Sequence, residues 1–145
     1  MEKELEKLLE ENQLERVDIG EQEAENGLRV AFSHLESARL ILDSDTPGSL
    51  QLSYDAARKA LQAVLAKAGL RVRKPPRGNH FTFVRVSRSG LVDREIWIPL
   101  DWMREMRNAS EYSVLSGEEA DQEDAQQSID AAQRMLSNAA AILIA

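Results

Sequence analysis

Near the end of a helical pattern, the chain places an arginine, an asparagine and a tyrosine where they could act together on a phosphate ester. Arg107 and Glu111 are four residues apart, and so are Asn108 and Tyr112, so each pair shares one face of a helix. A guanidinium group matches two phosphate oxygens, and an amide or a phenol can orient a reacting hydroxyl. We interpret this stretch as a phosphate site. The alternative is an ordinary helix salt bridge between Arg107 and Glu111.

The charge of the chain is distributed unevenly. The formal net charge is −7 at pH 7, yet residues 71–107 hold nine Lys or Arg and only four acidic residues. A basic segment inside an acidic protein indicates a local anion site rather than a general attraction to nucleic acid. The alternative is that these arginines are only solvated surface residues. The basic residues that we expect to contact a phosphate group are Arg71, Arg73, Lys74, Arg77 and Arg104.

The composition is that of an ordinary globular protein. At 145 residues and 43% hydrophobic content, the chain is long enough for one domain with a core. It contains no cysteine, which excludes disulfides and thiolate metal sites. No apolar run approaches the roughly 18 to 20 residues that span a bilayer, and the charged N-terminus lacks a secretion signal. We therefore expect a cytoplasmic protein that uses no metal, no cofactor and no membrane.

Apolar residues at helical spacing dominate the chain. They predict long helices over residues 21–43, 47–68 and 96–113, and a capping box that begins at Ser116 predicts the start of a last helix. Gly69 is placed to end the second helix in a left-handed conformation. Short links between successive helices favour antiparallel packing. The predicted fold class is therefore all-α, an antiparallel bundle of four to five helices.

The remaining segments are less regular. Residues 1–24 are predicted to form a short charged helix and a polar connector, separate from a helical domain over residues 25–145. Two adjacent prolines exclude a helix from the basic loop over residues 71–79. In residues 80–88 the apolar residues alternate partly as in a strand, but the helical surroundings favour a short helix. We predict a helix there, with a strand as the alternative.

Parts of the sequence resemble the HEPN domain family. The stretches that carry the resemblance are Ser53-Tyr54-Asp55-Ala56-Ala57-Arg58-Lys59-Ala60-Leu61 with Gly69-Leu70-Arg71, then Gly78-Asn79-His80-Phe81, and Met103 to Tyr112. The resemblance covers roughly residues 25–144 and implies a HEPN-like helical bundle. The family typically carries an Arg-x(4–6)-His motif. Arg107 matches its arginine and Asn108 the polar residue that follows, whereas Tyr112 stands where the family has histidine.

The resemblance implies two functions of different classes. Many HEPN domains are metal-independent ribonucleases, often toxins paired with an antitoxin nucleotidyltransferase, and they act as homodimers. We therefore predict a metal-independent endoribonuclease of a toxin–antitoxin or defence system, with Arg107, Asn108, Tyr112 and His80 as candidate catalytic residues. The alternative is a catalytically inactive homodimer that binds a nucleotide or a partner such as a nucleotidyltransferase.

The absence of the motif histidine leaves the general base open. The reference pKa of tyrosine is near 10, so only about one phenol in a thousand is ionised at neutral pH. Two nearby arginines could lower the pKa of Tyr112, or its phenol could position the ribose 2′-hydroxyl without ionising. His80 could instead supply the base from outside the motif. The sequence therefore leaves open whether the chain cleaves RNA.

Overall fold

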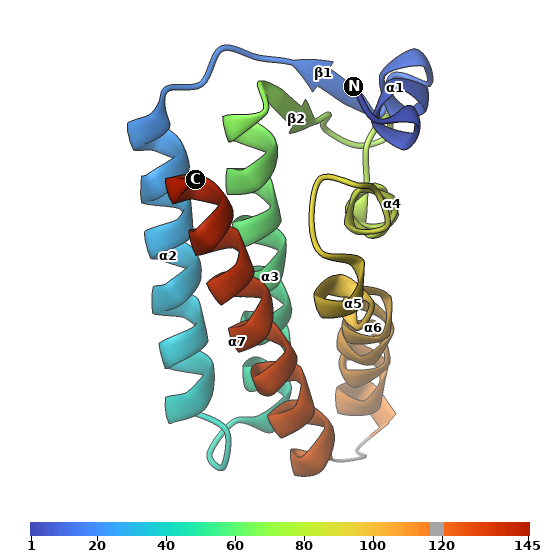
Figure 1. The fold of residues 1–145 in the computed structure, drawn as a ribbon. Helices are drawn as coiled ribbons and strands as arrows, with labels where there is room; N and C mark the ends of the chain where they lie inside the picture. The colour runs from blue at the N-terminus through green and yellow to red at the C-terminus, as the bar shows by residue number, and fades with distance from the viewer. Residues whose placement is uncertain (117–120) are drawn as a thin grey trace.

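Long helices make up most of the fold, and a small two-stranded sheet with a short helix lies at one end of them (Figure 1). The computed structural model describes the backbone of residues 1–116 and 121–145 and the side chains of residues 1–110 and 121–145. In chain order the elements are α1 (Lys3–Glu10), β1 (Leu14–Arg16), α2 (Glu21–Leu40), α3 (Thr46–Lys67), β2 (Leu70–Val72), α4 (His80–Ser87), α5 (Arg94–Trp97), α6 (Leu100–Ser116) and α7 (Gln122–Ile144). None of the helices in this described part has both the length and the apolar character needed to cross a lipid bilayer.

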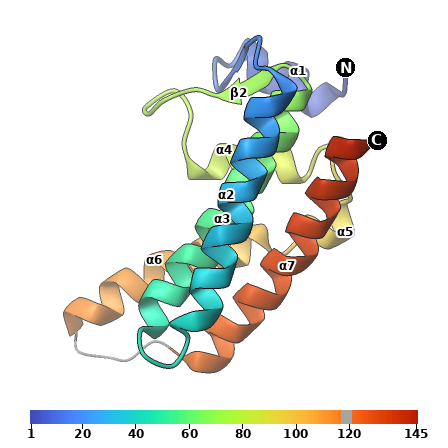
Figure 2. The same ribbon diagram turned by 90° about the vertical axis from the view of Figure 1, so that its left-hand side faces the viewer.

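Helix α3 lies at the centre of the bundle and packs against α2, α7 and α6. Figure 2 shows α2 and α3 running together, with α7 beside them and α6 inclined to the pair. Ala57 and Ala60 of α3 are completely buried, and their small side chains allow neighbouring helices to approach closely. Leu61 and Leu65 fill the space between the helices and are equally inaccessible. The prediction of an all-α antiparallel bundle is confirmed.

The helix predicted over residues 96–113 is divided in the structure. Helix α5 ends at Trp97 and α6 begins at Leu100, with Pro99 between them. Proline has no N–H to donate and its ring crowds the preceding turn, so the helical hydrogen bonds are interrupted there, although Ile98 keeps helical backbone angles. Pro99 nevertheless takes part in the first turn of α6, because its carbonyl oxygen accepts a hydrogen bond from the Met103 amide at 2.9 Å.

A two-stranded antiparallel sheet was not anticipated by the sequence. Strand β1 lies in the segment that we predicted to be a connector, and β2 begins directly after α3. Leu14 is opposite Val72 in the register. As predicted, Gly69 adopts a left-handed backbone, with φ of 76°, and so turns the chain from α3 into β2. Each strand has only three residues, too short for the alternating pattern that identifies strands in a sequence.

Residues 80–87 form helix α4, as we predicted, rather than a strand. The N-cap of α4 is Asn79, whose side chain accepts a hydrogen bond from the Thr82 amide at 3.2 Å. The Thr82 hydroxyl in turn accepts one from the Asn79 amide at 3.1 Å. This reciprocal pair satisfies two backbone donors at the start of the helix.

The start of the last helix differs from the prediction. Ser116 is the final residue of α6, and the N-cap of α7 is Asp121, whose side chain accepts a hydrogen bond from the Glu123 amide. The other residues of the predicted capping box lie outside the described part of the chain. The domain division after residue 24 stays a prediction.

The packing of α3 can be tested by a cavity-forming substitution. Leu61→Ala should lower the free energy of unfolding by about 2 to 5 kcal/mol, because Leu61 is fully buried between helices. Chemical denaturation followed by circular dichroism measures this loss. The control is Leu40→Ala at the end of α2, where the side chain is 76% exposed and the expected change is below about 0.5 kcal/mol. Equal losses in both variants would contradict the central position of α3.

Candidate functional site

A surface pocket of about 430 Å³ brings together residues that are far apart in the sequence. Helix α3, the loop after β2, the start of α4 and the middle of α6 all contribute to it. We name it the His80 pocket. Its lining residues are Asp55, Arg58, Gln62, Val72, Arg73, Lys74, Pro75, Gly78, Asn79, His80, Phe83 and Arg107. Four of these side chains are cationic and one is acidic, so the pocket favours an anion.

The α3 side of the pocket is formed by the polar face of a largely buried helix. Asp55, Arg58 and Gln62 are three and four residues apart, which places them on one face. Arg58 lies 3.5 Å from the Asp55 carboxylate and its guanidinium lies 5.6 Å from the centre of the Phe83 ring. The Arg58 Nε is buried and has no hydrogen-bond partner among the described residues. The position of this guanidinium is therefore set by packing as much as by its ion pair.

His80 is connected to the core by a buried tyrosine. The Tyr54 hydroxyl lies 2.9 Å from Nδ1 of His80, and Tyr54 itself is completely buried. Burial raises the pKa of Tyr54 to about 12, so the phenol keeps its proton at neutral pH. A buried hydroxyl needs an acceptor, and Nδ1 provides one. We assign the O–H as the donor, which leaves the imidazole proton on Nε2 and makes Nε2–H the group that a ligand would meet.

The same surroundings keep His80 uncharged at neutral pH. Partial burial, followed by the positive charges of Arg58 and Arg107, holds the pKa of His80 below its ordinary value of 6.5. Asp55 acts in the opposite direction and Arg104 adds a smaller effect of the same sign as the other arginines. A bound anion would reverse this balance, because it stabilises the imidazolium form.

Of the arginine motif, Arg107 lines the His80 pocket and Asn108 does not. Arg107 lines the His80 pocket from α6, and its Nη1 donates to Oδ1 of Asn108 at 3.4 Å. Asn108 is half-buried and is not part of the pocket lining. The backbone of Tyr112 belongs to α6, but its side chain, like that of Glu111, lies outside the described residues. The structure therefore brings Arg107 and His80 together.

Four of the five predicted basic residues, Arg71, Arg73, Lys74 and Arg77, line one hollow next to the His80 pocket. Arg73 and Lys74 also line the His80 pocket itself. Arg71 contacts the Glu15 carboxylate at 2.6 Å across the two strands, and this hydrogen bond lowers the pKa of Glu15. Arg71 is thus engaged in the sheet and lies outside the lining of the pocket.

Gly78 determines the course of the loop that carries Arg73 and Lys74. A Cβ atom at Gly78 would lie 2.2 Å from the backbone oxygen of Arg73, a distance that only glycine can accept. The loop therefore folds back tightly on itself between β2 and α4. This close approach brings its two cationic residues to the mouth of the His80 pocket.

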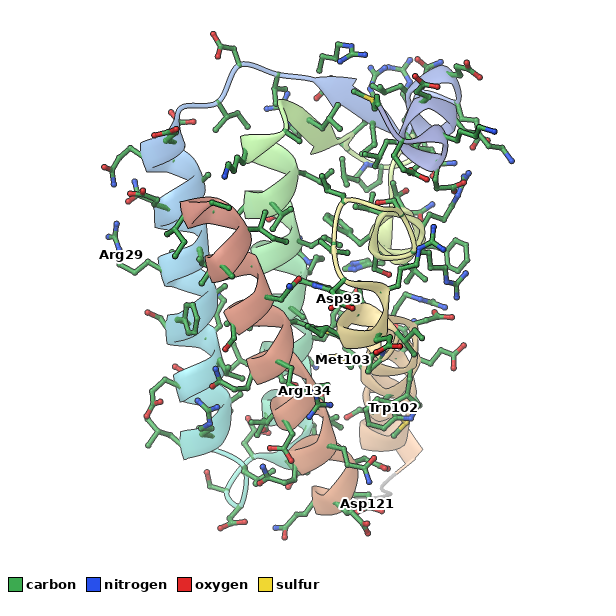
Figure 3. All side chains as sticks on the ribbon, in the orientation of Figure 1. Arg29, Asp93, Trp102, Met103, Asp121 and Arg134 are labelled. Carbon is green, nitrogen blue, oxygen red and sulfur yellow. The ribbon has the colours of Figure 1, made fainter. Side chains whose placement is uncertain are left out.

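Arg104 lies one turn before Arg107 on α6 but has other partners. Its Nε and Nη2 donate to the Asp101 carboxylate at 3.0 and 2.8 Å. Its guanidinium also lies 5.5 Å from the centre of the Phe81 ring. Its neighbours Trp102 and Met103 are labelled in Figure 3, and Met103 is buried whereas Trp102 is partly exposed. Arg104 is therefore near the pocket without lining it.

A family comparison agrees with this helical arrangement. A sequence model of the HEPN domain matches residues 24–141, which is well over half of the chain. The chain belongs to the HEPN domain family. No curated protein and no solved structure matches it. The HEPN match contains every residue that lines the His80 pocket.

Two residues at the His80 pocket were missed by our sequence analysis. Arg58 lines the pocket and Tyr54 is bonded to His80, but we named neither of them as a candidate site residue. Both occur in the stretch that carried the HEPN resemblance, and they are four residues apart in a helix that is otherwise rich in alanine. A large polar pair on one face of such a helix was the available signal. Among the described residues, no group of three or more His, Cys, Asp or Glu side chains could hold a metal ion.

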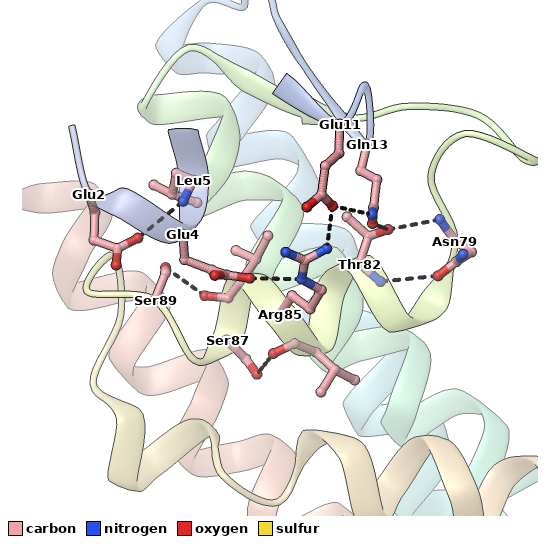
Figure 4. A network of polar contacts seen from close by, with 12 residues as sticks. Glu2, Glu4, Leu5, Glu11, Gln13, Asn79, Thr82, Arg85, Ser87 and Ser89 are labelled. Carbon is pink, nitrogen blue, oxygen red and sulfur yellow. Dashed lines mark hydrogen bonds and ion pairs between the residues drawn. The ribbon is translucent and has the colours of Figure 1, made fainter. Parts of the chain in front are cut away.

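The segment before the HEPN match is tied to α4 by a network of polar contacts (Figure 4). Arg85 of α4 donates to Glu4 and to Glu11, both at 2.7 Å. Its hydrogen bond to Glu11 holds the pKa of that carboxyl below the ordinary value. Gln13 accepts a hydrogen bond from the Thr82 hydroxyl at 2.8 Å. The N-terminal segment thus supports the helix that begins with His80.

The ionisation of His80 provides the first test of the pocket. An NMR titration should give His80 a pKa below 6.5, and Arg107→Gln should raise it because a neighbouring positive charge is lost. Since the unfolded chain takes up this proton more readily, the contribution of His80 to stability should fall as the pH drops below about 6.5. Arg134→Gln on α7 (Figure 3) removes a charge from outside the pocket and should leave the titration unchanged.

The Arg85 network can be tested by hydrogen exchange. Arg85→Gln should increase amide exchange across residues 3–16, because Glu4 and Glu11 lose their shared partner. The effect should be small and local, because the network is partly exposed to solvent. Protection in α2 and α3 should be retained. Unchanged protection of residues 3–16 would show that apolar contacts of Leu5 and Leu8 hold the segment by themselves.

Proposed function

We propose that this HEPN domain binds phosphate esters of RNA or nucleotides in the His80 pocket. The observation that carries the proposal is that Arg107 and His80, from different helices, line one pocket with Arg58, Arg73 and Lys74. The whole chain has a net charge of −7, so the excess of positive charge at the pocket is local and opposite in sign to that of the whole protein. An anion bound there would be attracted locally even though the protein as a whole repels nucleic acid.

The groups in the pocket have complementary tasks in phosphate binding. Arg107 can donate two parallel hydrogen bonds to phosphate oxygens, and its charge does not depend on pH in the physiological range. His80 can donate from Nε2, because the bond between Tyr54 and Nδ1 favours that tautomer. Arg73 and Lys74 lie on the loop at the mouth of the pocket, where they suit the neighbouring phosphates of a strand.

Substitution of Arg107 tests this proposal. Arg107→Gln should weaken the binding of a short oligoribonucleotide roughly 10- to 100-fold, because charge-assisted hydrogen bonds are lost. Isothermal titration calorimetry measures the affinity, and thermal melting verifies the fold. The matched control, Arg134→Gln on α7, changes the net charge equally outside the pocket and should retain the affinity. The proposal fails should both variants bind as the unchanged protein does.

A second candidate function is metal-independent RNA cleavage, the activity expected from the resemblance. It is favoured by the presence of an uncharged histidine beside an arginine, since a base must take the proton of the 2′-hydroxyl while a cation stabilises the phosphoryl oxygens. The tautomer assigned to His80 works against this role, because Nε2 already carries a proton. Asn108 and Tyr112 remain proposed orienting residues, and Tyr112 is a second candidate for the base.

Cleavage in the presence of EDTA separates the two functions. A nuclease should cut single-stranded RNA without metal and lose that activity in Arg107→Gln. Loss in His80→Asn but not in Tyr112→Phe would identify His80 as the base, and the opposite result would identify Tyr112. A protein that binds RNA with the expected Arg107 dependence but never cuts it is a binding module.

The proposed assembly is a homodimer in which two Arg107 residues approach one phosphate. Their mutual repulsion in the empty dimer would make an anion stabilise the assembly. A toxin role and a nucleotidyltransferase partner belong to the same proposal. Light scattering with and without inorganic phosphate, and co-purification with the product of a neighbouring nucleotidyltransferase gene, would test these points.

A further inference from the structure

An exposed aromatic ring lies next to the His80 pocket. Phe81 is the second residue of α4 and is 43% exposed, whereas Phe83 on the same helix is buried. The guanidinium groups of Arg88 and Arg104 lie 5.9 and 5.5 Å from the centre of the Phe81 ring. A single exposed phenylalanine is ordinary on a protein surface. An exposed ring with two arginines close to it is a surface on which flat, electron-rich groups can stack.

The two arginines are held with unequal firmness. Arg104 is 22% exposed and donates two hydrogen bonds to Asp101. Arg88 is 58% exposed and reaches the same carboxylate at 3.4 Å. Arg88 can therefore swing away from Phe81 at little cost, while Arg104 stays in place. An incoming planar group could take the position of Arg88 on the ring and leave that guanidinium free to pair with a phosphate.

The ring and the pocket are placed side by side by the same two helices. His80 and Phe81 are adjacent in the first turn of α4, and Arg104 and Arg107 lie on successive turns of α6. His80 and Arg107 line the pocket, while Phe81 contacts Arg104 and lines a separate hollow with Arg88. Every nucleotide of an RNA strand carries both a phosphate and a base, so a strand can present one group to the pocket and the other to the ring.

We propose that Phe81, with Arg88 and Arg104, forms a stacking site for a nucleobase of single-stranded RNA whose phosphate occupies the His80 pocket. This inference rests on the phosphate binding proposed above and adds the class of ligand. A base within a duplex has both faces covered by its neighbours, so a protein ring can stack only on an unpaired base. The preferred ligand is therefore single-stranded, and the pocket and the ring together contact at least one complete nucleotide.

The test compares two probes of equal charge. One is pentauridylate, and the other is an abasic ribose-phosphate chain of the same length, which has the phosphates without the bases. Phe81→Leu should weaken binding of pentauridylate roughly 5- to 150-fold, the range found for one stacked base, and should change binding of the abasic chain by less than about twofold. Phe81→Tyr, which keeps an aromatic ring, should retain the affinity for pentauridylate.

A second measurement uses the unchanged protein, so that it does not depend on the folding of a variant. The ring protons of Phe81 should shift in NMR spectra on addition of pentauridylate and not on addition of the abasic chain. The inference is overturned when Phe81→Leu retains the full affinity for pentauridylate or loses affinity for both probes equally. It is also overturned when the ring protons of Phe81 respond alike to both probes. It is also overturned, together with the proposed phosphate binding, when the unchanged protein binds neither probe.

The Arg107→Gln variant distinguishes the two failures. If it weakens binding of both probes while Phe81→Leu affects neither, phosphate binding in the His80 pocket stands and only the stacking site is wrong. If it weakens both probes while Phe81→Leu weakens pentauridylate alone, both proposals are supported.

Discussion

The burial of α3 is the constraint on which the rest of the structure depends. This helix contacts α2, α6 and α7, and twelve of its residues are buried, many of them alanines. A helix enclosed in this way can carry large polar side chains only where they reach the surface or find a partner. Asp55, Arg58 and Gln62 meet this condition at the His80 pocket, and Tyr54 meets it through its bond to His80. The position of the polar site therefore follows from the packing of the core.

The bond between Tyr54 and His80 connects the core to the chemistry of the surface. A buried phenol with a pKa of about 12 stays protonated, so it acts as a fixed donor and selects one tautomer of the imidazole. Partial burial, followed by the charges of Arg58 and Arg107, holds the pKa of that imidazole below its ordinary value. An uncharged hydrogen-bond donor suits reversible binding of an anion. Because Nε2 already carries the proton, anion binding by His80 has better physical support than base catalysis by His80.

The region before the HEPN match adds support to the opposite side of α4. Arg85 holds Glu4 and Glu11 and lines one hollow with Phe81, while His80 and Phe83 of the same short helix line the His80 pocket. An eight-residue helix is not stable by itself in water. Its contacts with the N-terminal segment and with α6 therefore determine how firmly His80 and Phe81 are held.

The sequence by itself determined the bundle, because helix spacing, prolines and glycines act over a few residues and appear directly in the pattern of side chains. It indicated the end of α3 at Gly69, the helix over residues 80–88 and the family, and it pointed to Arg107 and His80 separately. It did not reveal the two short strands. Only the tertiary structure brought His80, Arg58 and Arg107 into one pocket, turned Arg71 toward Glu15 and placed Phe81 beside Arg104. These contacts join residues on different elements, and their formation depends on how the whole bundle packs rather than on any local pattern.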